Sequence, residues 1–119
     1  MTGIEMFRCD VVRAERYAAG RTVFAEGEPG EKMYVVIEGE VELRVKGQTV
    51  ERLGPGGLLG EMSLVDPAPR SATAVTGTEA KLVAVDRRRF TSMIRTRPNF
   101  ALQIMRVMAD RLRRMDARL

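Results

Sequence analysis

The chain of 119 residues contains no histidine, no tryptophan and a single cysteine. Without histidine it lacks the commonest general acid-base group and the commonest metal ligand, which disfavours most classes of enzyme and gives no reason to expect a metal site. Cys9 has no second cysteine for a disulfide and no adjacent His or Cys for metal or nucleophile chemistry, so we interpret it as a structural thiol. We expect a protein that is not an enzyme and carries no cofactor.

Long apolar runs are also missing. No stretch approaches the ~18 consecutive apolar residues of a membrane span, and the N-terminus carries charges where a secretory signal has an apolar core. Hydrophobic residues make up 45% of the chain and charged residues 30%, a balance that lets a soluble domain bury a core. The sequence predicts one cytoplasmic domain over residues 1–119 with no membrane span.

Basic charge is concentrated in the last third of the chain. Residues 1–86 carry 10 Lys and Arg against 14 Asp and Glu, whereas residues 87–119 carry 10 against 2. A basic segment can touch nucleic acid through phosphate neutralisation, but no aromatic side chains alternate with these arginines to stack on bases. We interpret them mainly as a solvated helix face and expect no specific DNA binding.

Short runs that alternate apolar and polar residues, separated by Gly and Pro, fill the first two thirds of the chain. Such alternation is typical of half-buried strands, and we expect strands near residues 11–17, 22–25, 33–38, 41–46, 48–53, 71–76 and 80–86. Lys46-Gly47-Gln48 predicts a tight hairpin turn. The predicted fold is mainly β with C-terminal helices: a double-stranded, jelly-roll-like β-roll over about residues 11–86, then two helices over about 87–119.

Helical periodicity begins after Asp86, a plausible N-cap. We expect one helix to about Arg95, an interruption at Pro98, and a long helix from about Asn99 to the end. In the long helix an apolar stripe and an adjacent apolar face follow helical spacing: Met105, Met108, Leu112, Met115 and Leu119, and Phe100, Ile104 and Val107. The pattern fits either one wide stripe on the roll or a homodimer along the helix.

The segment 54-GPGGLLGEMSLVDPAPRSATAV-75 carries the most specific chemistry. Arg70 suits a phosphodiester anion, because a guanidinium can donate two parallel charge-assisted hydrogen bonds. A helix starting near Glu61 would direct free N–H groups at the same anion. Glu61 suits a ribose 2′-hydroxyl, and Gly60 allows close backbone approach. Taken alone, the pair also fits a structural Glu61–Arg70 salt bridge.

The run LGEMSLVDPAPRSATA closely resembles the phosphate-binding cassette of the cyclic nucleotide-binding domain family, which includes catabolite activator proteins, protein kinase A regulatory subunits and nucleotide-gated channels. A second match, 20-GRTVFAEGEPGEKMYVVIEGEVEL-43, looks like the family's first two hairpins. In that match Gly27, Gly30 and Gly39 turn the chain, and a set of apolar residues fills the roll: Phe24, Met33, Tyr34, Val36 and Val41. The resemblance extends over about residues 12–119. Two departures are Leu59, where the family often has Phe, and an N-terminal helix reduced to about residues 3–10.

The resemblance implies a cAMP or cGMP sensor whose ligand shifts the packing of the last helix. Glu61 would bind the 2′-hydroxyl and Arg70 the phosphate, assisted by Ser71 and Ala72, while Leu43 and Val50 would line the ribose and base pocket. The full predicted ligand-binding set is Gly60, Glu61, Met62, Arg70, Ser71, Ala72, Leu43 and Val50.

Base preference stays open at this stage. Met115 and Asp116 are candidates for a lid over the base: Asp116 favours guanine, whereas Ser71, in place of the Thr that often accompanies cGMP preference, favours adenine. The alternative function is a dimerisation or docking module of the same fold that binds no ligand. In either case the signal would pass to an output partner that the sequence does not identify.

Overall fold

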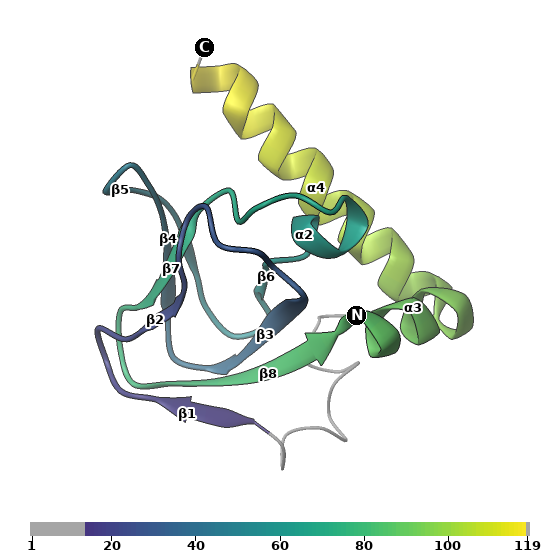
Figure 1. The fold of residues 1–119 in the computed structure, drawn as a ribbon, viewed down its shortest axis with the longest axis horizontal. Coiled ribbons are helices and arrows are strands. Elements are labelled where there is room, and N and C mark those ends of the chain that lie inside the picture. Colours follow the sequence, from purple (N-terminus) through teal and green to yellow (C-terminus); the bar gives the residue numbers. More distant parts are fainter. Residues whose placement is uncertain (1–13, 119) are drawn as a thin grey trace.

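The structure, a computed structural model, describes residues 14–118, with side chains described as far as Arg114. Eight strands are followed by two longer helices, with one short helix between the sixth and seventh strands (Figure 1). The elements are β1 (Glu15–Tyr17), β2 (Thr22–Phe24), β3 (Lys32–Glu38), β4 (Val41–Val45), β5 (Gln48–Leu53), β6 (Leu58–Leu59), α2 (Met62–Val65), β7 (Thr73–Thr76), β8 (Ala80–Asp86), α3 (Arg87–Thr96) and α4 (Pro98–Arg118).

The strands form two four-stranded antiparallel sheets, in the orders β1-β8-β3-β6 and β2-β7-β4-β5. Consecutive segments cross repeatedly between the sheets, so the chain is wound as a roll. In the β4–β5 hairpin Val45 pairs with Gln48, and Lys46 and Gly47 both have positive φ, at 51° and 82°. This two-residue connection matches the twist of the strands and confirms the tight turn that the sequence predicts.

The central strand β3 is buried on both faces because its side chains alternate. Met33, Val35 and Ile37 belong to a core between this sheet and the helices, whereas Tyr34 and Val36 contact the core inside the roll. The expectation that Met33 fills the roll is therefore wrong: next to Tyr34 it must point to the opposite face of the sheet. Met33 is still fully buried.

The two C-terminal helices cover the outer face of the β3–β8 sheet. Asp86 caps α3, since its carboxylate accepts a hydrogen bond from the backbone N–H of Arg89 at 2.8 Å. Pro98 is the first residue of α4, one residue earlier than expected, because a first-turn position needs no backbone N–H. The rings of Phe90 and Phe100 meet edge to face at 5.8 Å and join the two helices.

The far part of α4 runs past the roll and leaves apolar side chains in solvent (Figure 1). Leu102, Met105 and Leu112 are 47%, 61% and 58% exposed. These residues keep the homodimer along this helix as a prediction.

The structure confirms the predicted mainly β roll with C-terminal helices and differs from the sequence analysis in detail. The two-residue strand β6 was not expected, and the seventh strand begins at Thr73 instead of residue 71. The expected start of the first strand at residue 11, the short helix at residues 3–10 and Cys9 lie outside the described residues.

Candidate functional site

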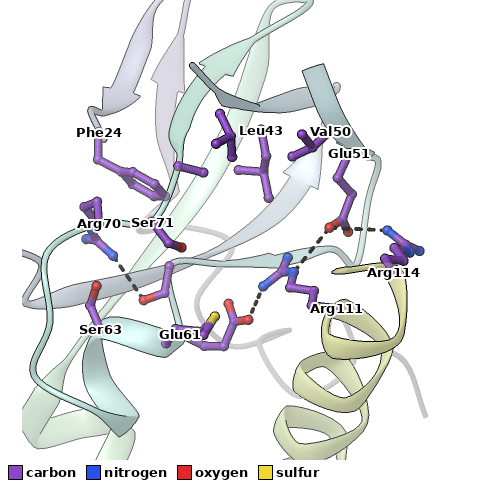
Figure 2. Close-up of a pocket in the computed structure, with 14 residues that line it drawn as sticks. Phe24, Leu43, Val50, Glu51, Glu61, Ser63, Arg70, Ser71, Arg111 and Arg114 are labelled. Carbon is purple, nitrogen blue, oxygen red and sulfur yellow. Dashed lines mark hydrogen bonds and ion pairs between the residues drawn. The ribbon is translucent and has the colours of Figure 1, made fainter. Parts of the chain in front are cut away.

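A cavity of about 260 Å³ opens between the β2-β7-β4-β5 sheet, the segment from Gly60 to Ala72, and α4. This volume is close to the lower end of the range for small-molecule sites, about 300–1,000 Å³. Fourteen residues line it (Figure 2): Phe24, Leu43, Val45, Val50, Glu51, Gly60, Glu61, Met62, Ser63, Arg70, Ser71, Ala72, Arg111 and Arg114. The structure thus brings all eight residues of the predicted ligand-binding set around one cavity, and their roles in binding stay predictions.

Arg70 lies at one end of the cavity and is only 5% exposed. Its Nη1 and Nη2 donate to the backbone carbonyls of Gly60 at 3.0 Å and Lys32 at 2.7 Å, and its guanidinium lies 4.1 Å from the centre of the Phe24 ring. Burial lowers the pKa of Arg70 below its ordinary value. Its Nε is buried with no hydrogen-bond partner among the described residues. The side chain is therefore held in place with one strong donor unused.

Two glycines make room for this guanidinium. A Cβ added to Gly30 would lie 2.6 Å from both Arg70 Nε and Ser63 Oγ. A Cβ on Gly60 would lie 2.6 Å from Arg70 Nη1, and Gly60 also has a φ of +79°, which favours glycine. The close backbone approach predicted for Gly60 is thus observed, and Gly30 has the same effect from the β2–β3 loop.

Glu61 is fully buried immediately before α2. Its side chain does not cap that helix. Oε1 instead accepts a hydrogen bond from Nη1 of Arg111, while Oε2 is buried with no hydrogen-bond partner among the described residues. The salt bridge that the sequence left open as an alternative is therefore formed with Arg111, and both hydrogen bonds of Arg70 go to backbone oxygens.

Arg111 of α4 is the functional residue that the sequence analysis missed. Besides Glu61 it contacts Glu51 through Nε at 3.2 Å and donates through Nη2 to the Leu58 carbonyl at 2.8 Å. Burial lowers the pKa of Arg111, but the charges of Glu61 and Glu51 outweigh that effect and raise it overall. This side chain ties the last helix to the cavity at three points.

Arg114 continues the same helix face, because residues three apart lie on one side of a helix. It contacts Glu51 at 3.3 Å and Asp110 at 2.9 Å. The spacing of Arg111 and Arg114 was a usable signal, but among so many arginines the sequence alone did not separate it from a solvated face. Arg111, Arg114 and Glu51 together close the end of the cavity opposite Arg70 (Figure 2).

An apolar wall lies between the two charged ends. Leu43 is buried, and Val50 and Ala72 are half-buried. Met115 and Asp116, the candidate base lid, belong to the last turn of α4, but their side chains lie outside the described residues. Within residues 14–118 no group of three or more His, Cys, Asp or Glu side chains could hold a metal ion, and no helix in this part of the chain is long and apolar enough to cross a membrane.

Comparison with known proteins gives three consistent matches. The CRP-like cAMP-activated global transcriptional regulator of Mycobacterium tuberculosis is 40% identical over 105 residues, covering 84% of this chain and 47% of the regulator. The cyclic AMP receptor protein of Thermus thermophilus is 39% identical over 108 residues, covering 87% of this chain and 50% of the receptor. The crystal structure of the Thermus thermophilus catabolite activator protein matches with a TM-score of 0.79 at 36% identity, over 95% of this chain and 56% of that one.

This chain spans about half the length of the curated relatives it matches. The profile described as "Cyclic nucleotide-binding domain" matches residues 14–97, which include the roll, α2 and α3. The fold and the buried Glu and Arg of the cavity agree with that match. The chain belongs to the cyclic nucleotide-binding domain family.

Proposed function

We propose that this domain is a sensor that binds a cyclic nucleotide, cAMP in the first instance, without altering it chemically. Arg70 would hold the cyclic phosphate and Glu61 the ribose 2′-hydroxyl. The observation that carries the proposal is that both buried side chains keep an unused hydrogen-bonding atom, Arg70 Nε and Glu61 Oε2, at one cavity. A donor and an acceptor of opposite charge match the two polar parts of such a ligand.

The charge of the cavity supports the same class of ligand. Its described lining includes three guanidinium groups, of Arg70, Arg111 and Arg114, and two carboxylates, of Glu51 and Glu61. The cavity therefore has one positive charge in excess, and a cyclic phosphodiester is a monoanion. The names of the relatives from Mycobacterium tuberculosis and Thermus thermophilus, which specify cAMP, favour adenine.

A docking module of the same fold without a ligand is the alternative. It gives no reason for leaving Glu61 Oε2 and Arg70 Nε buried and unpaired, each at a cost of about 1–3 kcal/mol. Such atoms are rarely retained in a purely structural core. The observed burial therefore favours ligand binding over a docking role alone.

Signalling would proceed by a shift in the population of α4 positions, since a ligand can favour only a state that it contacts better. Arg111 gives α4 direct contact with Glu61, the residue proposed to bind the ribose. The receiver would be a separate partner or another part of a longer protein. Transcriptional regulation, which the name of a relative specifies, is a property of that longer protein.

Calorimetric titration with cAMP, cGMP and 5′-AMP tests the proposal. We expect cAMP to bind at micromolar concentration or tighter and 5′-AMP much more weakly. Arg70→Ala should weaken cAMP binding by about 2–5 kcal/mol, the usual cost of removing one partner of a buried charge contact. The matched control is Arg52→Ala, because the Arg52 side chain is 64% exposed and outside the cavity.

A second variant covers the case in which Arg70→Ala does not fold. Glu61→Gln keeps the shape of the side chain and should reduce the preference of the domain for cAMP over its 2′-deoxy analogue. Absence of heat with either cyclic nucleotide at millimolar concentration would leave the docking module as the better explanation.

A further inference from the structure

Glu51 places a carboxylate at the end of the cavity away from Arg70. It lies on β5 beside Val50, and its side chain is 14% exposed. Figure 2 shows it directed toward Arg111 and Arg114 of α4, across the cavity from Ser71 and Arg70. Neither the predicted binding set nor the proposed function gives this group a role.

The contacts of Glu51 leave one of its oxygens available. Arg111 Nε and Arg114 Nη1 both contact Oε1, at 3.2 Å and 3.3 Å. Neither guanidinium contacts Oε2 within the described part of the chain. Two cations therefore hold the carboxylate ionised and oriented, while its second oxygen remains an unused acceptor at the cavity wall.

The position of this acceptor fits the base of the proposed ligand. With the phosphate on Arg70 and the ribose on Glu61, the base extends along the apolar wall of Leu43 and Val50 toward β5 and α4. A carboxylate only accepts hydrogen bonds, so it requires a donor on the ligand. The donors on the edge of a purine are the exocyclic amino groups and the N1–H of guanine.

We propose that Glu51 determines base specificity by accepting a hydrogen bond from an exocyclic amino group of the ligand. The inference rests on the proposed function, because it requires the phosphate at Arg70. For cAMP the group is the 6-amino group of adenine, and for cGMP it is the 2-amino group of guanine. A site built to receive a donor rejects the analogue that lacks it, since the carboxylate oxygen would then be desolvated without compensation.

Glu51 also holds α4 through its two ion pairs, so a loss of affinity on mutation is not sufficient evidence. The informative quantity is the ratio of affinities for two ligands that differ only in the amino group. Removal of the 6-amino group from cAMP gives purine riboside 3′,5′-cyclic monophosphate. Removal of the 2-amino group from cGMP gives inosine 3′,5′-cyclic monophosphate.

The four nucleotides are titrated into the wild-type domain, Glu51→Leu, Glu51→Gln and the control Glu42→Leu. Glu42 is a matched control because it is also a strand glutamate bound to two arginines, Arg44 and Arg52, but outside the cavity. We expect the wild type and Glu42→Leu to bind the amino ligand of one pair about tenfold or more tightly than its partner, the effect of a hydrogen bond to a charged group.

In Glu51→Leu that ratio should fall to about one, mainly through weaker binding of the amino ligand. Glu51→Gln keeps an acceptor oxygen and the side-chain shape, so it should fold and show a reduced ratio. The pair that responds identifies the amino group, and either pair supports the proposal.

Two results would overturn the inference while leaving the proposed function standing. One is a wild-type domain that binds all four nucleotides without discrimination. The other is a uniform loss of affinity in Glu51→Leu with both ratios unchanged, which would mean that Glu51 only holds α4. Failure of the wild type to bind any of the four would instead contradict the proposed function itself, and this inference with it.

Discussion

At the scale of single residues, the site depends as much on missing side chains as on those present. Arg70 reaches the cavity end because Gly30 and Gly60 leave space beside its guanidinium. Gly30 has no positive φ, so its role is purely steric, and it can be tested without backbone strain.

Gly30→Ala should therefore displace Arg70, because the added Cβ would lie 2.6 Å from its Nε. We expect a loss of stability of about 1–3 kcal/mol from overpacking and at least a tenfold weaker affinity for cAMP. The control is Gly54→Ala, since a Cβ at Gly54 meets no atom within 4 Å and its φ is not positive. Urea unfolding and calorimetry measure both quantities. Equal behaviour of the two variants would show that the space beside Arg70 is not required.

The residues of the site differ in how far the sequence predicts them. Glu61 and Arg70 belong to one continuous segment whose local pattern is informative, and the structure places both at the cavity. Arg111 and Glu51 lie sixty residues apart and meet only after α4 has docked on the roll. The direction in which Arg111 points depends on the buried Phe100 and Ile104 that fix α4. No local pattern contains that information.

At the scale of elements, α2 depends on the rest of the fold for its stability. It has four residues, too few to form an isolated helix. Its C-terminal carbonyls accept hydrogen bonds from Arg87, the first residue of α3: Leu64 O from Nη1 at 3.0 Å and Ser63 O from Nη2 at 3.3 Å. The cavity segment is thereby connected to the helices that follow the roll.

Arg87→Ala should loosen α2, because two carbonyls lose a charged donor. We expect a stability loss of about 1 kcal/mol, since the arginine is largely exposed, and faster amide exchange in residues 62–66. The neighbouring Arg88 is exposed and serves as the control, as Arg88→Ala. Hydrogen exchange read by mass spectrometry is the measurement. Unchanged exchange in α2 would mean that the preceding strand and loop hold this helix without Arg87.

Elements with a clear period are the ones that the sequence predicts well. β3 and β8 each have seven residues, and their alternation reports which face meets which core. β6 has two residues and no period to detect, and it exists because Leu58 and Leu59 pair with Val35 and Tyr34 of β3. Residues 71 and 72 read as strand by composition, but they are bent around the cavity. Short elements of this kind are determined by tertiary contacts.

At the scale of the whole molecule, the uneven charge distribution of the sequence has a structural consequence. The acidic part of the chain supplies Glu51 and Glu61, and the basic part supplies Arg111 and Arg114. Their ion pairs join the roll to α4 at the cavity. We had interpreted the C-terminal arginines as a solvated face, and for these two that interpretation is wrong, because the helix turns them toward the carboxylates.

This arrangement makes Arg111 the link through which ligand binding would reach α4. Addition of cAMP should slow amide exchange in residues 98–118 of the wild-type domain, because the ligand orders Glu61 and with it the helix. Arg111→Met keeps much of the side-chain volume but removes the ion pair with Glu61, so it should destabilise the domain by about 3 kcal/mol and reduce the response of α4.

The control for this experiment is Arg113→Met, because Arg113 lies on the exposed face of the same helical turn. Exchange is compared at saturating ligand for each variant, so that weaker binding alone does not lower the response. If Arg111→Met still slows exchange in α4 as the wild type does, the signal passes through apolar contacts of the helix and the ion pair is only structural. If the wild type itself shows no change in α4, the helix does not respond to the ligand, and a sensor of this fold would have to signal through the roll alone.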